Sequence, residues 1–204
     1  RRRIGIVFQD YQLLTDRNVF MNLYYVMKAT GWKREQEIRE RIDRVLGLVE
    51  LGSKSYKMPF ELSGGQKRRV AIAGVMAMNP KVLILDEPAS GLDPKGREQI
   101  LGLIREYHEQ MQNTVLLVSH SMEDIAKNVS KILVMNESKL FCYDDTVKVF
   151  HRSEELVSMG LAVPQITRVI NRLKAMGIDI KDDVYTVGYA KKVILEMLEQ
   201  KKNK

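Results

Sequence analysis

The stretch Leu62-Ser63-Gly64-Gly65-Gln66 constrains the fold of this chain more than any other. A serine and two glycines, followed by a basic and apolar run up to Met78, indicate the start of a helix in which Ser63 accepts a backbone N–H bond as the N-cap. Because glycine has no Cβ, an anion can approach the backbone N–H groups of this helix end closely. The triplet alone is equally typical of a simple turn before a helix, so its surroundings must decide its function.

Short apolar runs alternate with amphipathic segments over the first two thirds of the sequence. Alternation of this kind predicts an α/β fold with a parallel sheet and right-handed crossovers. The continuous run Val82 to Leu85 is typical of a strand buried on both faces. The other expected strands are Ile4–Phe8, Thr114–Val118 and Lys131–Met135, and the expected helices are Val19–Thr30, Lys33–Leu51, the run after Ser63, the segment opened by Asp93-Pro94, and Met122–Val129.

The segment from about 15 to 78 is nearly all helical in pattern, which predicts a helical subdomain inserted between strands of the sheet. In the helix after Pro94, four side chains are expected to face inward, namely Ile100, Leu101, Ile104 and Tyr107. The composition changes near His151, where we expect a boundary between a domain of residues 1–150 and an extension of residues 151–204. Three short helices are predicted in this extension: Ser153–Met159, Pro164–Met176 and Tyr189–Gln200.

Composition excludes several classes of protein. With 45% hydrophobic and 29% charged residues, the chain is typical of a globular protein. The net charge of +7 is spread along the sequence, which favours a solvated surface over a nucleic-acid interface. The single cysteine, Cys142, excludes an intrachain disulfide. No apolar run reaches the roughly 18 residues that span a bilayer, so a membrane role would require a partner. The start without methionine on an apparent strand suggests a fragment.

Two adjacent carboxylates, Asp86 and Glu87, follow the apolar run that ends at Leu85. Open α/β sheets bind their ligands at the carboxyl ends of the strands. Adjacent residues on a strand point in different directions, so the two carboxylates can serve different tasks. A strand-end cap or an ion pair is the alternative interpretation. Gln9 and His120 also follow expected strands, and either could equally be an ordinary polar residue there.

The order of the motifs resembles the ATPase subunit of ABC transporters. Leu62 to Gln66 is similar to the signature motif of that family, Val82 to Pro88 to Walker B, Ser90 to Asp93 to the D-loop, and Ser119-His120 to the switch histidine. The resemblance implies a P-loop NTPase fold of ABC type and hydrolysis of ATP with Mg²⁺. The chain is then an N-terminally truncated form of that fold with a small, mostly helical C-terminal extension.

The resemblance also assigns roles. Asp86 would hold Mg²⁺, directly or through water, and Glu87 would act as the general base toward the water that attacks the γ-phosphate. Gln9 would contact the metal and the attacking water. His120 would donate a hydrogen bond to the γ-phosphate.

The signature motif acts in trans in this family. The resemblance therefore implies that Ser63, Gly64, Gly65 and Gln66 present a helix N-terminus to ATP held by the opposite subunit. Asp93 of the D-loop would lie across the same interface. Hydrolysis would then require a head-to-tail pair of ATPase subunits.

A Walker A loop, G-x-x-x-x-G-K-[ST], is expected before Gln9, but no stretch of the sequence matches this pattern. The run from Gly47 to Ser55 comes close, yet its Lys54 is one position late and the run follows a helix instead of a strand. We interpret it as a helix-exit turn. The chain alone is therefore not expected to hold ATP, although it could still offer its signature to another subunit.

Most of the chain, Gln36 to Lys192, looks like the ATPase of energy-coupling-factor (ECF) transporters, which import vitamins and transition-metal ions. The implied partners are a second ATPase (homo- or heterodimer), a transmembrane coupling subunit and a substrate-binding membrane subunit, at the cytoplasmic face of the membrane. The stretches that carry this resemblance are Pro59–Ala73, Asp86–Pro94, Leu156–Leu161 and Pro164–Thr167. In that family the C-terminal extension helps the two ATPases to pair.

The first segment, Arg1 to Trp32, looks closer to the ABC ATPase of bacterial cell division or to lipoprotein-releasing relatives. Three alternatives therefore stay open at this point. They are an ECF ATPase, a cell-division ATPase and a non-hydrolysing cassette that only completes the site of another subunit. A chain spliced from two ABC ATPases is a further possibility.

Overall fold

The computed structural model describes residues 3–10, 12–181 and 183–202, and the side chains among them up to Glu199. The chain divides into two compact units, Arg1–Val118 and Ser119–Lys204, which we describe separately.

The first unit is built on a three-stranded parallel sheet in the order β1-β2-β3. The strands are β1 (Ile4–Val7), β2 (Val82–Asp86) and β3 (Thr114–Val118), as the sequence predicts. In the register of the ladder, Val7 pairs with Leu85 and Asp86 pairs with Val118. The last residues of the three strands therefore lie at one edge of the sheet.

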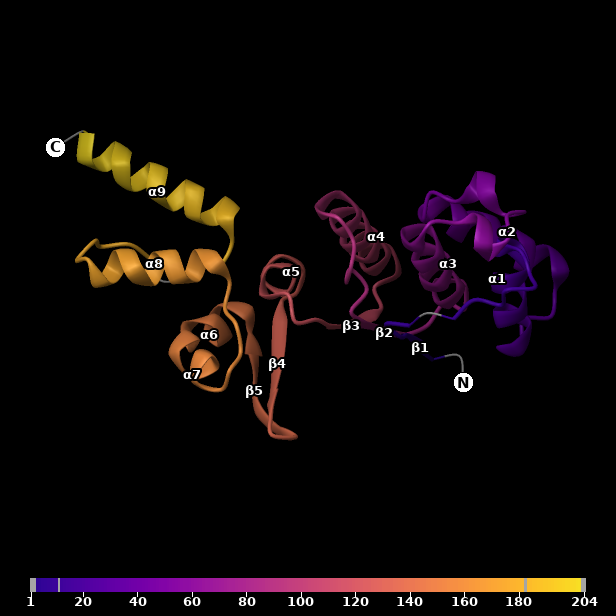
Figure 1. Cartoon of the computed structure of the whole chain (residues 1–204), viewed down its shortest axis with the longest axis horizontal. Helices are drawn as coiled ribbons and strands as arrows, with labels where there is room; N and C mark the ends of the chain where they lie inside the picture. Colours follow the sequence, from indigo (N-terminus) through magenta and orange to yellow (C-terminus); the bar gives the residue numbers. More distant parts are fainter. Residues whose placement is uncertain (1–2, 11, 182, 203–204) are drawn as a thin grey trace. The chain divides into compact units, whose positions relative to one another are not determined.

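Helices fill the two connections between these strands. The first connection contains α1 (Val19–Ala29), α2 (Glu35–Leu48), the short 3-10 helices η1 (Gly52–Lys54) and η2 (Pro59–Glu61), and α3 (Gly64–Ala77). The second contains α4 (Pro94–Met111). All four predicted α-helices of this unit are confirmed, with ends displaced by a few residues. Figure 1 shows α3 and α4 on one side of the strands.

The core of the first unit lies between that side of the sheet and the helices. Leu83 and Leu85 of β2 are fully buried. The four inward residues predicted on α4 are all buried: Ile100, Leu101, Ile104 and Tyr107. At Gly5 a Cβ atom would lie 2.3 Å from Cγ1 of Val75 on α3. Glycine at this position therefore lets α3 approach β1 closely.

The opposite side of the sheet is not buried in the described structure, contrary to the sequence prediction for β2. Ile4 of β1 is 55% exposed, and Leu116 and Val118 of β3 are 51% and 52% exposed. Along β2 the residues alternate between buried and half-buried. The prediction of a strand buried on both faces fails because α3 and α4 cover one side only.

The C-terminal end of α3 is held by a half-buried arginine from α2. Arg41 Nη2 donates to the carbonyl oxygen of Met76 at 2.8 Å, and its Nε donates to that of Ala77 at 3.4 Å. Tyr107 Oη of α4 donates to the same Met76 carbonyl at 3.2 Å. Burial lowers the pKa of Arg41. The last carbonyls of a helix have no partners within it, so these bonds cap α3 and join it to α2 and α4.

We expect Arg41→Met to lower the free energy of unfolding of the first unit by about 2 kcal/mol, because charge-assisted hydrogen bonds to buried carbonyls would be lost. Chemical denaturation monitored in this unit measures the change. Arg44→Met is the matched control, since Arg44 lies on the same helix with its side chain exposed. Equal stability of the two variants would contradict the capping role of Arg41.

The second unit contains a β-hairpin that follows one helix and precedes four others in the described chain. Its elements are α5 (Met122–Asn128), β4 (Lys131–Asn136), β5 (Lys139–Asp145), α6 (Thr146–His151), α7 (Ser153–Ser158), α8 (Gln165–Ala175) and α9 (Val187–Lys202). The helices predicted near α5, α7, α8 and α9 are confirmed, and so is the strand at β4. β5 and α6 were not predicted from the sequence.

The hairpin also corrects the expectation that β4 belongs to the parallel sheet. This strand pairs antiparallel with β5 in a two-stranded sheet. Its turn residues, Glu137 and Ser138, both have positive φ values, 48° and 61°. A two-residue hairpin turn of this type usually contains asparagine or glycine. Because neither is present at these two positions, the turn could not be predicted from the sequence.

The structural division after Val118 differs from the sequence boundary expected near His151. The reason is a small core that the hairpin shares with the helices that follow it. Side chains of α5 and β4 pack there with side chains of α6 and α7 and with Val163. The buried residues of this core are Ala126, Val134, Val149, Phe150, Leu156 and Val163. A second core, between α8 and α9, includes Ile170 and Val193.

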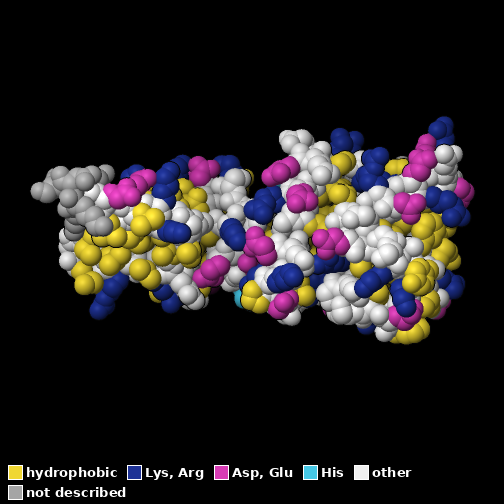
Figure 2. Space-filling model, turned by 90° about the horizontal axis from the view of Figure 1, so that it is seen from above, with side chains coloured by type: hydrophobic (Ala, Val, Ile, Leu, Met, Phe, Trp, Pro, Cys, Tyr) yellow, Lys and Arg dark blue, Asp and Glu magenta, His cyan; other side chains and the backbone are white. Residues whose placement is uncertain are grey.

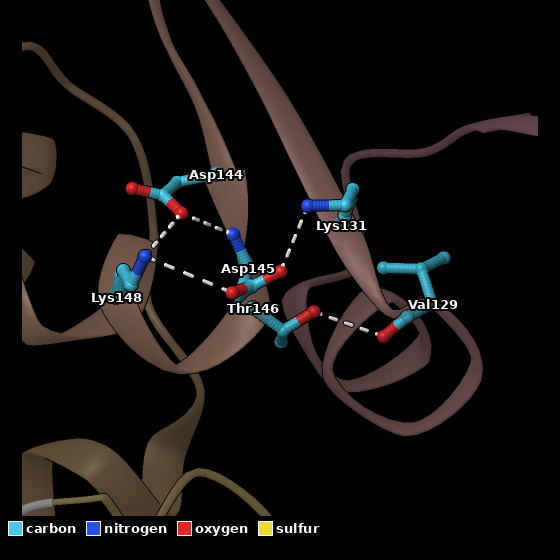
Figure 3. Close-up of polar contacts among 6 residues, drawn as sticks. All are labelled: Val129, Lys131, Asp144, Asp145, Thr146 and Lys148. Atoms are coloured by element: carbon cyan, nitrogen blue, oxygen red, sulfur yellow. Dashed lines mark hydrogen bonds and ion pairs between the residues drawn. The ribbon is translucent and has the colours of Figure 1, made fainter.

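Ion pairs join the hairpin to the start of α6 (Figure 3). Lys131 Nζ of β4 lies 2.9 Å from Asp145 Oδ1. Lys148 Nζ of α6 lies 3.0 Å from Asp144 Oδ1 and 3.8 Å from Asp145 Oδ2. The backbone N–H of Asp145 donates to Asp144 Oδ1 at 2.8 Å. This N–H bond and the Lys148 ammonium lower the pKa of Asp144.

The hydroxyl of the buried Thr146 reinforces the same corner by donating to the carbonyl oxygen of Val129 at 2.9 Å. On the basic side, the bond to Asp144 raises the pKa of Lys148, and the bond to Asp145 raises the pKa of Lys131. The charged forms of these groups are therefore favoured in the folded chain.

The stabilisation from Asp144 is present at neutral pH and is lost as the pH falls through its depressed folded pKa. The stabilisation from Lys148 is present below its unfolded pKa and is lost as the pH rises through its raised folded pKa. We therefore expect Lys148→Met to lower the melting temperature slightly at pH 7 and by a decreasing amount as the pH falls through the depressed folded pKa of Asp144. Thermal unfolding of both chains across this range measures the difference. A difference that is constant with pH would contradict the ion-pair account.

Candidate functional site

The carboxyl edge of the parallel sheet brings several of the predicted site residues together. Asp86 is the last residue of β2 and is half-buried, and Glu87 follows it directly. Gln9 lies two residues beyond the end of the neighbouring strand β1, with its side chain exposed. The structure thus places one amide and two carboxylates at the ends of adjacent strands.

The backbone at Glu87 has a conformation that is uncommon for a non-glycine residue. Its φ is 48°. Its N–H donates to the carbonyl oxygen of Val118 at 3.0 Å, and its own carbonyl accepts from Ser90 N–H at 3.2 Å. These two bonds hold the turn that leaves β2. Strained backbone of this kind is frequent at functional sites. The positive φ of Glu87 also turns the chain away from the strand direction directly after Asp86, the last residue of β2.

The signature stretch forms the predicted capped helix start. Ser63 Oγ accepts from Gln66 N–H at 3.3 Å, and Gln66 Oε1 accepts from Ser63 N–H at 3.1 Å. This reciprocal pair is a capping box. Ser63 and Gly64 are exposed. The N-terminal end of α3, a favourable place for an anion, is therefore accessible within the first unit.

The turn before the signature is held by a second reciprocal contact. Glu61 accepts from Lys57 Nζ at 2.7 Å and from the backbone N–H of Met58 at 2.7 Å. The bond from Lys57, followed by the bond from Met58, lowers the pKa of the Glu61 carboxyl. The carboxylate thus stays ionised and fixes the chain two residues before Ser63.

The D-loop leads directly into α4. Asp93 is the N-cap, and its Oδ1 accepts from the N–H of Gly96 at 3.1 Å. Pro94 occupies the first helical position, where a missing N–H has no cost. A Cβ at Gly96 would lie 2.7 Å from Asp93 Oδ1, so glycine leaves room for this cap. Asp93 itself is exposed.

Two arginines of α3 were not predicted as site residues, yet they tie α3 to its neighbours. An Nη1 hydrogen bond joins Arg68 to the carbonyl oxygen of Ser90 in the turn after β2. Arg69 Nη2 donates to Gln99 Oε1 of α4 at 2.7 Å, and its Nη1 lies 2.6 Å from Glu50 Oε2. In the sequence, both belong to the basic and apolar run that follows the two glycines. Their spacing, four and five residues after the glycine that begins the helix, was the available signal.

His120 belongs to the second unit, two residues beyond the end of β3. Its side chain is exposed, and the neighbouring Ser121 donates its N–H to Ser119 Oγ at 3.1 Å. That His120 forms one site with the carboxylates of the first unit stays a prediction.

The donors at the sheet edge are compatible with Mg²⁺ but do not form a complete site. Among the described residues, no three His, Cys, Asp or Glu side chains converge to hold a metal ion. Mg²⁺ keeps several waters and often takes one or two carboxylates together with substrate phosphates. One half-buried carboxylate, Asp86, with the oxygen of a nearby amide, fits that pattern. With a nucleotide bound, Asp86 and Gln9 are the residues that would hold the ion.

The run Gly47 to Ser55 forms the exit of α2, as predicted, and no phosphate-binding loop. Gly47 lies within α2, Glu50 has a positive φ of 58°, and Lys54 ends the 3-10 helix η1. The run therefore lacks the strand that precedes a P-loop.

An apolar groove of about 660 Å³ lies beside the end of β1 in the first unit. It is lined by residues that follow β1 and by faces of α1 and α3, including Phe8, Leu14, Tyr25, Val26 and Val75. The buried Asn22 fixes the loop at its border. Its Nδ2 donates to the carbonyl oxygen of Leu14 at 3.1 Å, and its Oδ1 accepts from Leu14 N–H at 2.7 Å. Asn22, a lone polar residue on an apolar helix face, was not predicted as a functional residue from the sequence.

Comparison with known proteins decides the family. The family profile described as ABC transporter matches residues 1–90. The energy-coupling factor transporter ATP-binding protein EcfA2 of Clostridium tetani is 45% identical over 205 residues, which cover 98% of this chain and 70% of that protein. EcfA2 of Bacillus subtilis is 36% identical over 206 residues, which cover 99% of this chain and 74% of that protein.

This chain belongs to the ATP-binding subunits of ECF transporters. A solved structure, CbiO1 of Clostridium perfringens, supports the fold, with a TM-score of 0.67 and 36% identity over 84% of this chain and 68% of that one. CbiO1 is described as part of the ABC transporter complex CbiONQ. The prediction of an ABC-type α/β fold and of an ECF-type ATPase subunit is thereby confirmed.

The family relationship includes the N-terminal segment. EcfA2 of Caldanaerobacter subterraneus is 45% identical over 206 residues, which cover 100% of this chain and 71% of that protein. The match to one ECF protein therefore extends across Arg1 to Trp32, the part that resembles cell-division ATPases. None of the helices described here is long and apolar enough to span a membrane.

Proposed function

We propose that this ECF ATPase subunit offers its signature turn and D-loop to ATP held by a second ATP-binding subunit. One observation carries the proposal: the N-terminal end of α3 and the D-loop Asp93 are both exposed in the first unit. A helix N-terminus favours a phosphate through its backbone N–H groups and its dipole. Ser63, Gly64, Gly65 and Gln66 form that end.

The residues at the sheet edge take the other roles. Asp86 and Gln9 would hold Mg²⁺ with the nucleotide phosphates, and the ion would neutralise charge that develops during phosphoryl transfer. Glu87 accepts a proton from the attacking water as general base, and its turn conformation places it beside Asp86. His120 donates a hydrogen bond to the γ-phosphate. Each of these assignments rests on position in the fold and on the family motifs.

For ATP binding at its own site, the chain would need a phosphate-binding loop. The sequence contains no G-x-x-x-x-G-K-[ST] loop, whose backbone N–H groups and lysine bind phosphate in P-loop proteins. We therefore propose that the chain alone does not hydrolyse ATP.

The partners follow from two surfaces. The apolar groove beside the end of β1 would receive a segment of the transmembrane coupling subunit of an importer of vitamins or transition-metal ions. Tyr25 at its rim is 41% exposed. A substrate-binding membrane subunit would complete the assembly, and the ATPase would lie at the cytoplasmic face of the membrane through these partners.

Residues 151–204 would serve as the extension through which two ATPase subunits pair. Figure 2 shows apolar side chains gathered over the C-terminal helices. Val169 of α8 is 49% exposed, and Met176, the C-cap residue of this helix, is 69% exposed. On α9, Leu195 and Leu198 are 48% and 49% exposed. Exposed apolar patches of this kind are frequent at protein interfaces.

A mixing assay tests the proposal. The second subunit is full-length EcfA2 of Clostridium tetani with an intact Walker A loop but with its signature serine replaced by arginine, so its own pairs are inactive. We expect no ATP hydrolysis by this chain alone and restored hydrolysis after mixing. Ser63→Arg in this chain should abolish the restoration. Hydrolysis by the chain alone would contradict the proposed lack of ATP binding, and failure to restore hydrolysis would contradict action in trans.

A second experiment tests the base. The N-terminal part of EcfA2 that carries the Walker A loop is joined to this chain, and Glu87→Gln is introduced. We expect hydrolysis to fall by about 100-fold or more because general-base catalysis is lost, while ATP binding, followed by equilibrium dialysis, stays close to that of the parent. Retained hydrolysis would remove Glu87 from this role.

A further inference from the structure

We propose that Arg68 is a positioning residue that holds the D-loop turn against the signature helix, so that both elements reach the opposite subunit as one body. The inference rests on the proposed action in trans and adds to it a residue that sets the geometry. Arg68 lies in the second turn of α3, one turn after the signature glycines. It is half-buried.

The first contact between the two elements is the hydrogen bond from Arg68 Nη1 to the carbonyl oxygen of Ser90. Ser90 is itself fixed on its other side, since its N–H donates to the carbonyl oxygen of Glu87 at 3.2 Å. A charged donor on a carbonyl gives a stronger bond than a neutral one. Arg68 therefore connects the signature helix to the turn that begins at the general base.

A second, independent approach of the two elements lies nearer the N-terminal end of α3. The Leu92 side chain lies beside Gly65, since its Cδ2 is 3.5 Å from the position that a Cβ on this glycine would occupy. The Leu92 side chain also packs against the core of the first unit. The backbone N–H of Leu92 donates to the carbonyl oxygen of Ala89 at 3.4 Å. The turn from Ser90 to Leu92 is thus hydrogen-bonded to α3 at Ser90 and lies close to it at Leu92.

Arg69 holds the same helix through two other partners. Its contacts with Gln99 and Glu50 hold α3 to α4 and to the end of α2, and its side chain is only 16% exposed. Asp93, the last residue of the D-loop, caps α4. The D-loop is thus joined to α3 at its first residue, Ser90, and the helix that follows it is joined to α3 through Gln99. Of these residues, Arg68 is the one that contacts the loop itself.

This arrangement predicts a specific kinetic effect. In the mixing assay the ATP is bound by the Walker A loop of the second subunit, while signature and D-loop act when the two subunits close. Loss of Arg68 should therefore lower kcat of the restored hydrolysis and leave KM for ATP little changed. We expect Arg68→Met to lower kcat by about tenfold, the rate equivalent of one charge-assisted hydrogen bond.

Three variants separate positioning from general stability. Arg68→Lys keeps one donor for the Ser90 carbonyl and should recover part of kcat. Arg105→Met is the matched control, because Arg105 is exposed on α4 and loses the same charge. Leu92→Ala removes the other contact, and its effect combined with Arg68→Met should be smaller than the sum, since both act on one junction.

Amide hydrogen exchange of the chain alone gives a readout that needs no partner. We expect Arg68→Met to speed exchange at Ser90 and Leu92, with no change in the Arg105→Met variant. Unchanged exchange at these amides, or equal restoration of hydrolysis by wild type and Arg68→Met, would overturn the inference while leaving the proposed function intact. Failure of the wild-type chain to restore hydrolysis would overturn both.

Discussion

The first turn of a helix presents backbone N–H groups that no preceding turn satisfies, and the candidate site of this chain is arranged around such a turn. In α3, Ser63 and Gln66 satisfy one another's backbone N–H groups through a capping box. The cap fixes where the helix begins and leaves its end exposed. The same helix is anchored at its other end, where Arg41 and Tyr107 bind its final carbonyls. A rigid α3 is what allows an exposed turn to present a defined geometry to a ligand.

The sheet edge and the signature helix are linked through a short piece of chain. β2 ends at Asp86, Glu87 turns the backbone with a positive φ, and Ser90 meets Arg68 of α3. Asp86, the proposed metal ligand, Glu87, the proposed base, and the D-loop thus follow one another within eight residues, from Asp86 to Asp93. A displacement of α3 would move the D-loop with it. This coupling gives a physical basis for a site that two subunits complete together.

Much of this arrangement could be predicted from the sequence because it depends on local rules. Ser63 and Asp93 are side chains with strong N-cap preference, and the apolar run before Asp86 marks a strand whose end holds ligands. The contacts of Arg68 and Arg69 could not be predicted, since they join segments that are distant in the sequence. Asn22 bonds to a loop only eight residues before it, but no regular motif signals this contact. The turn at Glu137 and Ser138 lacks the residues that usually signal a hairpin, so β5 was missed. The exposed face of the parallel sheet was also unexpected, because an apolar strand sequence does not tell which side the helices of this chain cover.

Action in trans is the central claim, and ATP-dependent association tests it most directly. Sedimentation velocity would compare this chain mixed with full-length EcfA2 of Clostridium tetani that binds ATP without hydrolysing it, in the presence and absence of ATP. The account predicts a mixed dimer that forms with ATP, dissociates without it, and is lost when Ser63 is replaced by arginine. Association that depends neither on ATP nor on Ser63 would contradict the account, because the subunits would then pair without the signature turn contacting the nucleotide.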